Sequence, residues 1–425
     1  MQKKISVGAV VVICIIITIV SSMTTVVFLG ESFNSRLNEL NEKYLDKMSV
    51  IEEQMAEFGD IAADLRYIDQ LYREMYPGEL DNDQLRNYAI KGFVAGSGDR
   101  YGFYYSPDEA EELMNSISGE TDGIGINVIY DADKGCIEII SVNEDSPADK
   151  AGVKTGDYIA YVVSVDGEKE AVAEIGYDAA LSRMKGKAGT KAEFTVFRDD
   201  DGDGVYDELD FVVERAHIDA VSIDHHIYEP DKTIGIIRIT GFDKKTPEQF
   251  FAAVDALKAE GAEKLIFDVR YNPGGDKDAV CEILDYLVPE GPLLRTVDAE
   301  GNYTVDMTSG KSELNMPMAV VTNSGTASAG ELFAAAIRDY GKGKLVGETT
   351  YGKGSMQSII PVFDDGSLLR ITVARYCPPI TENYDGVGLV PDVPVEIDEA
   401  LKDKNFYKYT DSEDNQLRAA AATFE

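Results

Sequence analysis

Two loops rich in small residues carry the side chains best suited to chemistry. Residues 323–331 (Asn-Ser-Gly-Thr-Ala-Ser-Ala-Gly-Glu) place Ser328 at the start of a predicted helix, where free N–H groups favour developing negative charge. Residues 350–357 (Thr-Tyr-Gly-Lys-Gly-Ser-Met-Gln) place Lys353 between two glycines, where burial would disfavour the charged amine. A neutral lysine can act as general base to a serine hydroxyl, and Gln357 is spaced to orient that amine. The loops therefore predict a serine nucleophile with a lysine base.

Each loop has a simpler interpretation when it is taken alone. Ser328 also fits an N-cap in a packing joint of small residues, and Gly-Lys-Gly is common in solvated turns. The histidines narrow the choice, because His217, His225 and His226 all lie between the two predicted domains, away from both loops. A metal site is disfavoured as well, since only two histidines are close in sequence and adjacent strand residues face opposite sides. The sequence thus favours lysine over histidine as the base.

The elements that must position these loops form two groups. Residues 120–215 predict a compact mixed unit, with strands at 124–130, 136–142, 158–165, 194–198 and 209–215, and helices at 146–151 and 171–184. The later residues predict an α/β pattern, with strands at 233–239, 264–269, 318–322, 344–347 and 368–376, and helices at 247–260, 276–287 and 329–340. Apolar strands that alternate with helices indicate a largely buried sheet.

The N-terminus predicts a membrane anchor. Residues 5–29 are apolar and uncharged, which is enough to span a bilayer as a helix, and Lys3 and Lys4 place the N-terminus in the cytoplasm. A cleaved signal peptide is the alternative, but its apolar region should be about 7–15 residues long. Residues 31–75 continue as an amphipathic helix that either pairs two chains, forms a stalk or packs on its own domain. We therefore expect a single-pass protein of a bacterial-type cell membrane, with its main part outside the cytoplasm and a homodimer possible.

Composition excludes several classes of protein. The 425 residues include 40 Lys+Arg against 77 Asp+Glu, a net charge of −37, whereas nucleic-acid binding needs a basic surface. A hydrophobic content of 44% allows proper cores, so this is not an acidic disordered chain. Four cysteines and three histidines are too few for a disulfide scaffold or a Cys/His zinc cluster. We expect no required cofactor.

The two loops together resemble the catalytic signature of the C-terminal processing peptidases, also called tail-specific proteases. The matching stretches are residues 325–331 and 351–357, and their separation also matches. The resemblance implies that Ser328 is the nucleophile, Lys353 the general base and Gln357 the polar residue that supports the base. It also implies a protease domain of the crotonase-like type.

A third stretch, residues 268–275 (Asp-Val-Arg-Tyr-Asn-Pro-Gly-Gly), resembles the family's strand-end loop. This implies that Gly274 or Gly275 supplies an oxyanion-hole N–H beside that of Ala329. Weaker matches extend the similarity over about residues 65–396, and they lie at residues 91–93, 99–101, 106–107 and 388–392. The departures are mild and remove no catalytic group: Thr326 and Gly330 replace usual serines, and Arg100 replaces a usual proline.

The family places a PDZ domain ahead of the protease domain, and residues 120–215 resemble one. In such a domain, backbone N–H groups capture a chain terminus while the peptide adds as a strand. The carboxylate-binding loop would consist of Gly123, Ile124, Gly125 and Ile126. An ordinary glycine-rich strand start is the alternative. Lys185 falls where relatives often carry a basic residue linked to peptide sensing.

An acidic turn at residues 199–210 is spaced like a calcium loop. Aspartates occupy positions 1, 3, 5, 9 and 12 of the loop, namely Asp199, Asp201, Asp203, Asp207 and Asp210. The last ligand is usually glutamate, and the flanks here predict strands rather than helices. A plain acidic hairpin turn is therefore the alternative to a structural Ca²⁺ site.

These observations predict a multidomain protein of the α+β and α/β classes. Its parts are a cytoplasmic tip and transmembrane anchor (1–30), a helical N-terminal segment (31–119), a PDZ domain (120–215), a Ser/Lys peptidase domain (216–400) and a C-terminal tail (401–425). The expected activity is that of a membrane-anchored serine endopeptidase that recognises proteins or peptides by their free C-termini and forms an acyl-enzyme. The alternatives are a catalytically silent PDZ adaptor at the cell surface and an unrelated α/β enzyme.

Overall fold

The computed structural model describes residues 59–425, apart from 133, 165, 201–203, 298–300, 312 and 403. The chain divides into two compact units, one ending at Arg86 and the other comprising Asn87–Glu425. In the first unit, residues 59–75 are helical, which agrees with the last part of the predicted amphipathic helix. The predicted anchor, residues 5–29, lies outside the described part of the chain. Within that part, no helix combines the length and the apolar composition that crossing a membrane requires.

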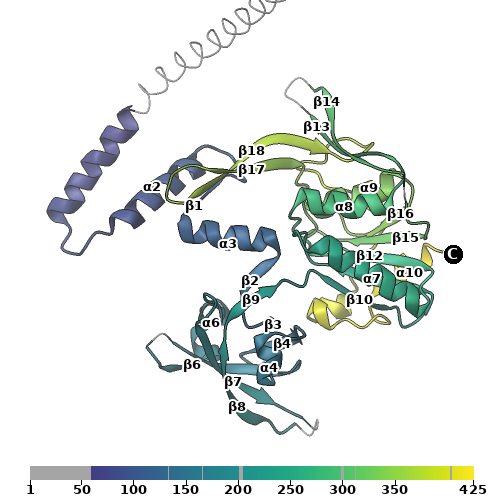
Figure 1. Ribbon diagram of the computed structural model, residues 1–425, viewed down its shortest axis with the longest axis horizontal. Helices are drawn as coiled ribbons and strands as arrows, with labels where there is room; N and C mark the ends of the chain where they lie inside the picture. Colours follow the sequence, from purple (N-terminus) through teal and green to yellow (C-terminus); the bar gives the residue numbers. More distant parts are fainter. Residues whose placement is uncertain are drawn as a thin grey trace, which may run out of the picture. The chain divides into compact units, whose positions relative to one another are not determined.

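The second unit contains a six-stranded sheet in the order β10-β11-β12-β15-β16-β19, of which β10, β12, β15 and β16 are labelled in Figure 1. All neighbouring pairs are parallel except β10 with β11. Its strands are β10 (Ile223–Ile227), β11 (Ile234–Ile239), β12 (Lys264–Asp268), β15 (Met318–Thr322), β16 (Gly343–Gly347) and β19 (Val393–Pro394). The α/β pattern predicted from the sequence is confirmed, because the predicted strands at 233–239, 264–269, 318–322 and 344–347 all belong to this sheet.

Helices cover both faces of this sheet because its strands are apolar on both sides. Ile237 and Leu265 belong to a core that includes side chains of three helices, whereas Ile236 and Ile266 face the opposite core. The three helices are α7 (Thr246–Glu260), α8 (Lys277–Leu287) and α9 (Ala329–Asp339). The opposite core contains α10 (Asn415–Ala422), which follows the short 3₁₀ helices η1 (Glu399–Leu401) and η2 (Phe406–Lys408). The segment that the sequence sets apart as a tail at 401–425 is therefore part of the protease core.

A buried ion-pair network fastens α10 to the end of β12. Arg270 Nη2 lies 2.7 Å from Asp268 Oδ2 and 2.8 Å from Asp414 Oδ2, and all three side chains are buried. Burial raises the pKa of Asp268, but the charges of Arg270 and Arg238 outweigh burial and hold it at about 2. Because this value is below the ordinary value near 4, the carboxylate stabilises the fold above about pH 4, and that contribution is lost as the pH falls towards 2.

Replacing Arg270 by methionine should therefore destabilise the protein by about 3–5 kcal/mol, since Asp414 would be left as a buried charge without this partner and Asp268 would keep only Arg238. The measurement is the denaturant midpoint at pH 7. Lys402→Ala is the control, because its pair with Glu399 is exposed and should change stability by less than about 0.5 kcal/mol. A midpoint for Arg270→Met equal to that of the control would contradict the prediction.

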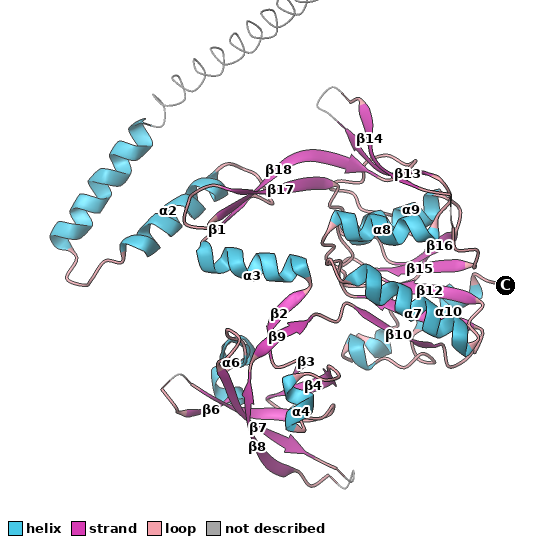
Figure 2. Ribbon diagram, in the orientation of Figure 1, coloured by secondary structure: helices cyan, strands magenta, loops and turns pink. Residues whose placement is uncertain are grey.

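A second sheet combines strands from distant parts of the chain. Figure 2 shows β17 and β18 as two long strands, and β18 also pairs with β1 and β13. The strands are β1 (Phe103–Tyr105), β13 (Gly291–Val297), β14 (Tyr303–Ser309), β17 (Ser355–Pro361) and β18 (Leu368–Cys377). The segment before residue 120 also supplies α2 (Asn82–Gly96) and α3 (Pro107–Ser118). The β13–β14 hairpin is missing from the elements expected from the sequence, although apolar Tyr303, Val305 and Met307 alternate with polar residues in β14.

Residues 120–215 form a separate small core around a mixed set of short elements. They are β2 (Glu120–Gly123), β3 (Ile126–Asp131), β4 (Cys136–Val142), α4 (Pro147–Ala151), β5 (Tyr158–Val163), β6 (Lys169–Ala171), α5 (Val172–Ile175), α6 (Tyr177–Met184), β7 (Lys191–Arg198) and β8 (Asp207–Glu214). The predicted pairing across the acidic turn is confirmed as β7–β8.

Two predicted elements in this region are interrupted at glycines. The helix expected at 171–184 is two helices, which Gly176 separates with a φ of 81°. The strand expected at 124–130 begins only at Ile126, because Gly125 has a φ of 83° and its backbone lies against Ser146. The unit is joined to the remainder by β9 (Ala216–Asp219), which pairs with β2.

Candidate functional site

Ser328 lies at a strained turn between β15 and α9. Its φ of 54° and ψ of −118° are unusual for a residue with a side chain and cost about 1–3 kcal/mol, which the surroundings must offset. Its N–H donates to Glu331 Oε2 at 2.9 Å, and the preceding Ala327 N–H donates to the Asn272 carbonyl at 2.8 Å. A serine on a sharp strand-to-helix turn exposes its hydroxyl, as nucleophilic serines require. Ser328 is thus the N-cap residue of α9, and it also lines the pocket described below.

Lys353 lies in the loop between β16 and β17 and is half-buried. Burial and the nearby charge of Arg370 lower the pKa of its amine, whereas the charge of Glu331 raises it. The balance is a lowered pKa. The ammonium nitrogen lies 4.8 Å from the centre of the Tyr101 ring, in the loop before β1. The side chain is therefore partly shielded from solvent, more than a fully solvated turn would leave it.

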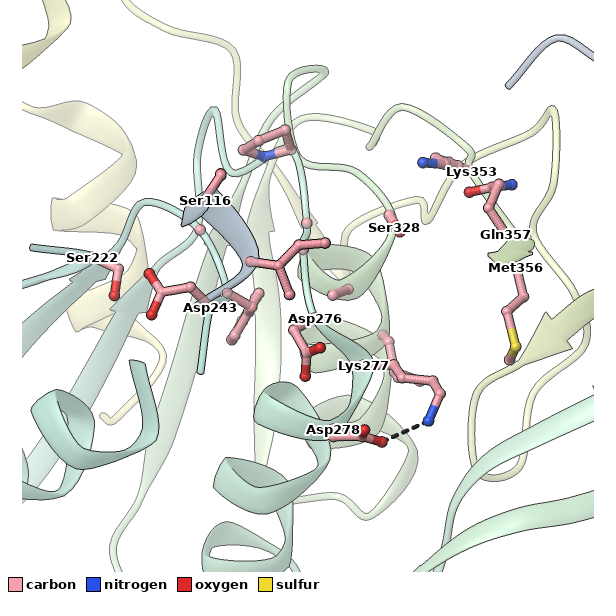
Figure 3. A pocket seen from close by; sticks show the side chains of 18 of the residues that line it. Ser116, Ser222, Asp243, Asp276, Lys277, Asp278, Ser328, Lys353, Met356 and Gln357 are labelled. Atoms are coloured by element: carbon pink, nitrogen blue, oxygen red, sulfur yellow. Dashed lines mark hydrogen bonds and ion pairs between the residues drawn. The ribbon is translucent and has the colours of Figure 1, made fainter. Parts of the chain in front are cut away.

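One pocket of about 630 Å³ brings the predicted residues together (Figure 3). Ser328, Lys353 and Gln357 all line it, although they come from different elements. Gln357 Nε2 donates to Ser355 Oγ at 3.0 Å and to Thr372 Oγ1 at 3.3 Å, so its amide nitrogen is engaged. Only its carbonyl oxygen is left to accept from the Lys353 amine.

The predicted oxyanion loop also reaches Ser328. A β-carbon added to Gly274 would lie 2.7 Å from Ser328 Cβ and 2.8 Å from the Ala329 nitrogen, so the absence of a side chain allows this close approach. The Gly274 N–H donates to Asn272 Oδ1 at 2.8 Å, which leaves Gly275 as the better donor of the two. Gly275 cannot carry a side chain either, because its β-carbon would meet the Phe242 carbonyl oxygen at 2.0 Å. Ala329, Gly274 and Gly275 all line the pocket.

The sequence interpretation assigned no role to Glu331, which links the two loops. Its side chain is fully buried and accepts hydrogen bonds from the N–H groups of Ser328, Gly352 and Lys353 at 2.8–2.9 Å, and from the Thr350 hydroxyl. The available signal was the spacing Ser-x-x-Glu, which is typical of a helix capping box. That signal predicts the bond to Ser328 but not the bonds to the second loop.

The residues predicted to bind a peptide terminus line a second pocket, of about 230 Å³. Gly123 is the last residue of β2, and Ile126 is the first of β3. The carbonyls of Ile124 and Gly125 already accept from Ala148 and Asn143. Lys185 lines the same pocket.

The acidic turn is described only in part. Asp199 Oδ2 accepts from the Gly204 N–H at 3.0 Å, and Asp210 accepts from the Thr195 hydroxyl at 2.6 Å with Lys169 also near. Asp207 lies opposite Arg198 in the β7–β8 ladder. No three acidic, histidine or cysteine side chains are placed to hold a metal in the part of the chain that the structure describes. Asp201 and Asp203 lie outside that part, so the calcium loop stays a prediction.

Comparison with known proteins agrees with this site. Residues 233–395 match the model of "Peptidase family S41". A carboxy-terminal-processing protease of Bartonella bacilliformis is 31% identical, over 81% of this chain and 75% of the relative. The carboxy-terminal processing protease CtpA of Bacillus subtilis is 30% identical, over 83% of this chain and 73% of the relative.

The fold agrees as well. A crystal structure of a Bacteroides fragilis protein described as an S41 protease has a TM-score of 0.52 with this chain, covers 84% of it and 96% of its own chain, and is 16% identical. The resemblance to the C-terminal processing peptidases is therefore confirmed, because the two relatives match over 81% and 83% of this chain. The chain belongs to peptidase family S41 and is a serine-type peptidase.

Proposed function

We propose that this peptidase cleaves proteins that it recognises by their C-terminal tails, through an acyl-enzyme on Ser328 with Lys353 as the base. The observation that carries the proposal is the shared pocket, which is lined both by a serine on a strained turn and by a half-buried lysine with a lowered pKa. A lowered pKa increases the fraction of neutral amine at neutral pH, and only the neutral amine can accept a proton.

The reaction follows from the groups in the pocket. Lys353 takes the proton of the Ser328 hydroxyl while the oxygen attacks the scissile carbonyl. The N–H groups of Ala329 and Gly275 stabilise the tetrahedral oxyanion, and Lys353 then gives its proton to the leaving amine. Water attacks the resulting ester while Lys353 takes its proton, and Lys353 then returns that proton to the Ser328 oxygen as the carboxylic acid product leaves. Gln357 would accept a hydrogen bond from the amine and hold it in place.

Apolar side chains line the pocket beside Ser328 and favour an apolar substrate residue before the scissile bond. They include Leu294, Leu332, Met356 and Ile359. An apolar side chain of the substrate would leave water on entering this pocket, which favours binding by about 25 cal/mol per Å² buried.

Recognition of the tail is proposed for residues 120–215, acting as a PDZ domain with Gly123, Ile124, Gly125 and Ile126 at its carboxylate-binding loop. Two observations support this: these residues line one pocket, and the two relatives are named for processing carboxy termini. Residues 5–29 would anchor the enzyme in the membrane, with its catalytic part outside the cytoplasm. The amphipathic helix of residues 31–75 would pair two copies of the chain. Residues 199–210 would bind Ca²⁺.

A fluorophosphonate probe tests the catalytic assignment, because it reacts only with an activated serine. We expect mass mapping to place the label on Ser328 alone, in the full chain incubated with an unstructured peptide that has a free C-terminus. The alternative, a silent PDZ adaptor, predicts peptide binding with neither labelling nor cleavage. Labelling of another serine would contradict the assignment.

A further inference from the structure

Glu331 is a buried carboxylate without a cationic partner. None of its side-chain surface is exposed, and no Lys, Arg or His of the described chain forms an ion pair with it. Burying a lone charge is costly unless hydrogen bonds compensate. Here they do, because both carboxylate oxygens together accept from four donors.

Two of those donors are the main-chain N–H groups of the proposed catalytic residues, and the other two belong to the loop that carries Lys353. Oε2 accepts from the N–H of Ser328 at 2.9 Å and from the N–H of Lys353 at 2.8 Å. Oε1 accepts from the N–H of Gly352 at 2.8 Å and from the Thr350 hydroxyl. One carboxylate therefore fixes the strained turn of the nucleophile relative to the loop of the base. Hydrogen bonds to an ionised acceptor are stronger than neutral ones, so this link is firm.

The carboxylate also lies where the reaction produces positive charge. When Lys353 accepts the proton of Ser328 it becomes a half-buried cation, and the charge of Arg370 from β18 disfavours that state. Other titratable groups at this centre include Tyr101, Tyr376, Tyr384 and Asp385, which contact Lys353, its loop or the Ser328 carbonyl. Glu331 raises the pKa of Lys353, which means that its negative charge stabilises the protonated amine. In serine-histidine-aspartate enzymes a buried aspartate does this for the protonated histidine.

We propose that Glu331 is a positioning residue of the Ser-Lys centre. Its carboxylate fixes the position of Ser328 relative to Lys353, and its charge stabilises Lys353 after that residue takes the proton. This inference rests on the proposed function and adds a third group to it.

Glu331→Gln tests the inference, with kcat, KM and the pH profile measured on an unstructured peptide. We expect kcat to fall about 10- to 100-fold, with KM changed less than about threefold. The acid limb of the pH profile, where the rate rises with pH, should move to lower pH, because removing the negative charge lowers the pKa of Lys353. Asp411→Asn is the matched control: it also removes a buried carboxylate that accepts a main-chain N–H, but it lies away from the pocket and should leave the profile unchanged.

A kcat within twofold of wild type together with an unmoved acid limb would overturn the inference, and a lower kcat with an unmoved limb would overturn its electrostatic part. If Glu331→Gln does not fold, Thr350→Val removes one donor and keeps the charge. It should lower kcat about threefold or more with the acid limb in place, and an unchanged kcat would count against the proposal. Failure of the wild-type protein to cleave or to be labelled at Ser328 would instead reject the proposed function itself.

Discussion

Replacing Ser328 by alanine should reduce peptide cleavage by about 10⁵- to 10⁶-fold, the loss typical of a missing serine nucleophile. The physical reason is that no acyl-enzyme can form, while the oxyanion donors and the pocket remain. Folding should be retained because the Ser328 N–H keeps its bond to Glu331, although the contacts of the hydroxyl with Tyr376 and with the first turn of α9 are lost. The measurement is the single-turnover rate on an unstructured peptide with a free C-terminus.

Peptide affinity provides the control for this variant. Fluorescence anisotropy of the same peptide should give the wild-type dissociation constant, because the proposed tail-binding pocket does not include Ser328. Cleavage by Ser328→Ala at more than about a hundredth of the wild-type rate would show that another group is the nucleophile. Loss of binding together with cleavage would point to a damaged fold.

The sequence was sufficient to find the two loops because their chemistry is local. A serine before a helix and a lysine between glycines are visible as short patterns. The number of residues between Ser328 and Lys353 also limits which elements can connect the two loops. The strands that carry them were also predictable, because buried strands are continuous apolar runs. The structure adds that the two loops follow β15 and β16, which are parallel neighbours. Both loops therefore lie at the carboxyl ends of these strands, on the same side of the sheet.

What could not be predicted depends on contacts across the chain. Glu331 lies 22 residues from Lys353, and no local pattern indicates their hydrogen bond. Residues 401–425 were expected to form a tail, whereas Leu417 of α10 packs on the six-stranded sheet. The choice between Gly274 and Gly275 as oxyanion donor likewise required the position of Asn272. In each case the deciding partner is distant in sequence.

Replacing Lys353 by arginine should abolish cleavage at every pH, with a loss of at least about 10³-fold. Arginine stays protonated at all pH values of interest, so it cannot accept the proton of Ser328. In the wild-type enzyme, activity should rise with pH through the pKa of Lys353, which lies below the ordinary value of 10.5. A cleavage rate for Lys353→Arg near that of wild type would exclude lysine as the base.

The position of the acid limb tests why that pKa is lowered. Burial would act equally in all variants, but Arg370 lowers the pKa of Lys353 by charge repulsion while Glu331 raises it. Arg370→Met should therefore move the acid limb of kcat/KM to higher pH, opposite in sign to the shift expected for Glu331→Gln. Arg370 also donates to the Tyr101 carbonyl at 3.0 Å, so a general loss of rate is expected as well. Only a change in electrostatics at Lys353 predicts opposite displacements for the two variants, because damage to the fold would lower the rate without moving the limb in a direction set by charge.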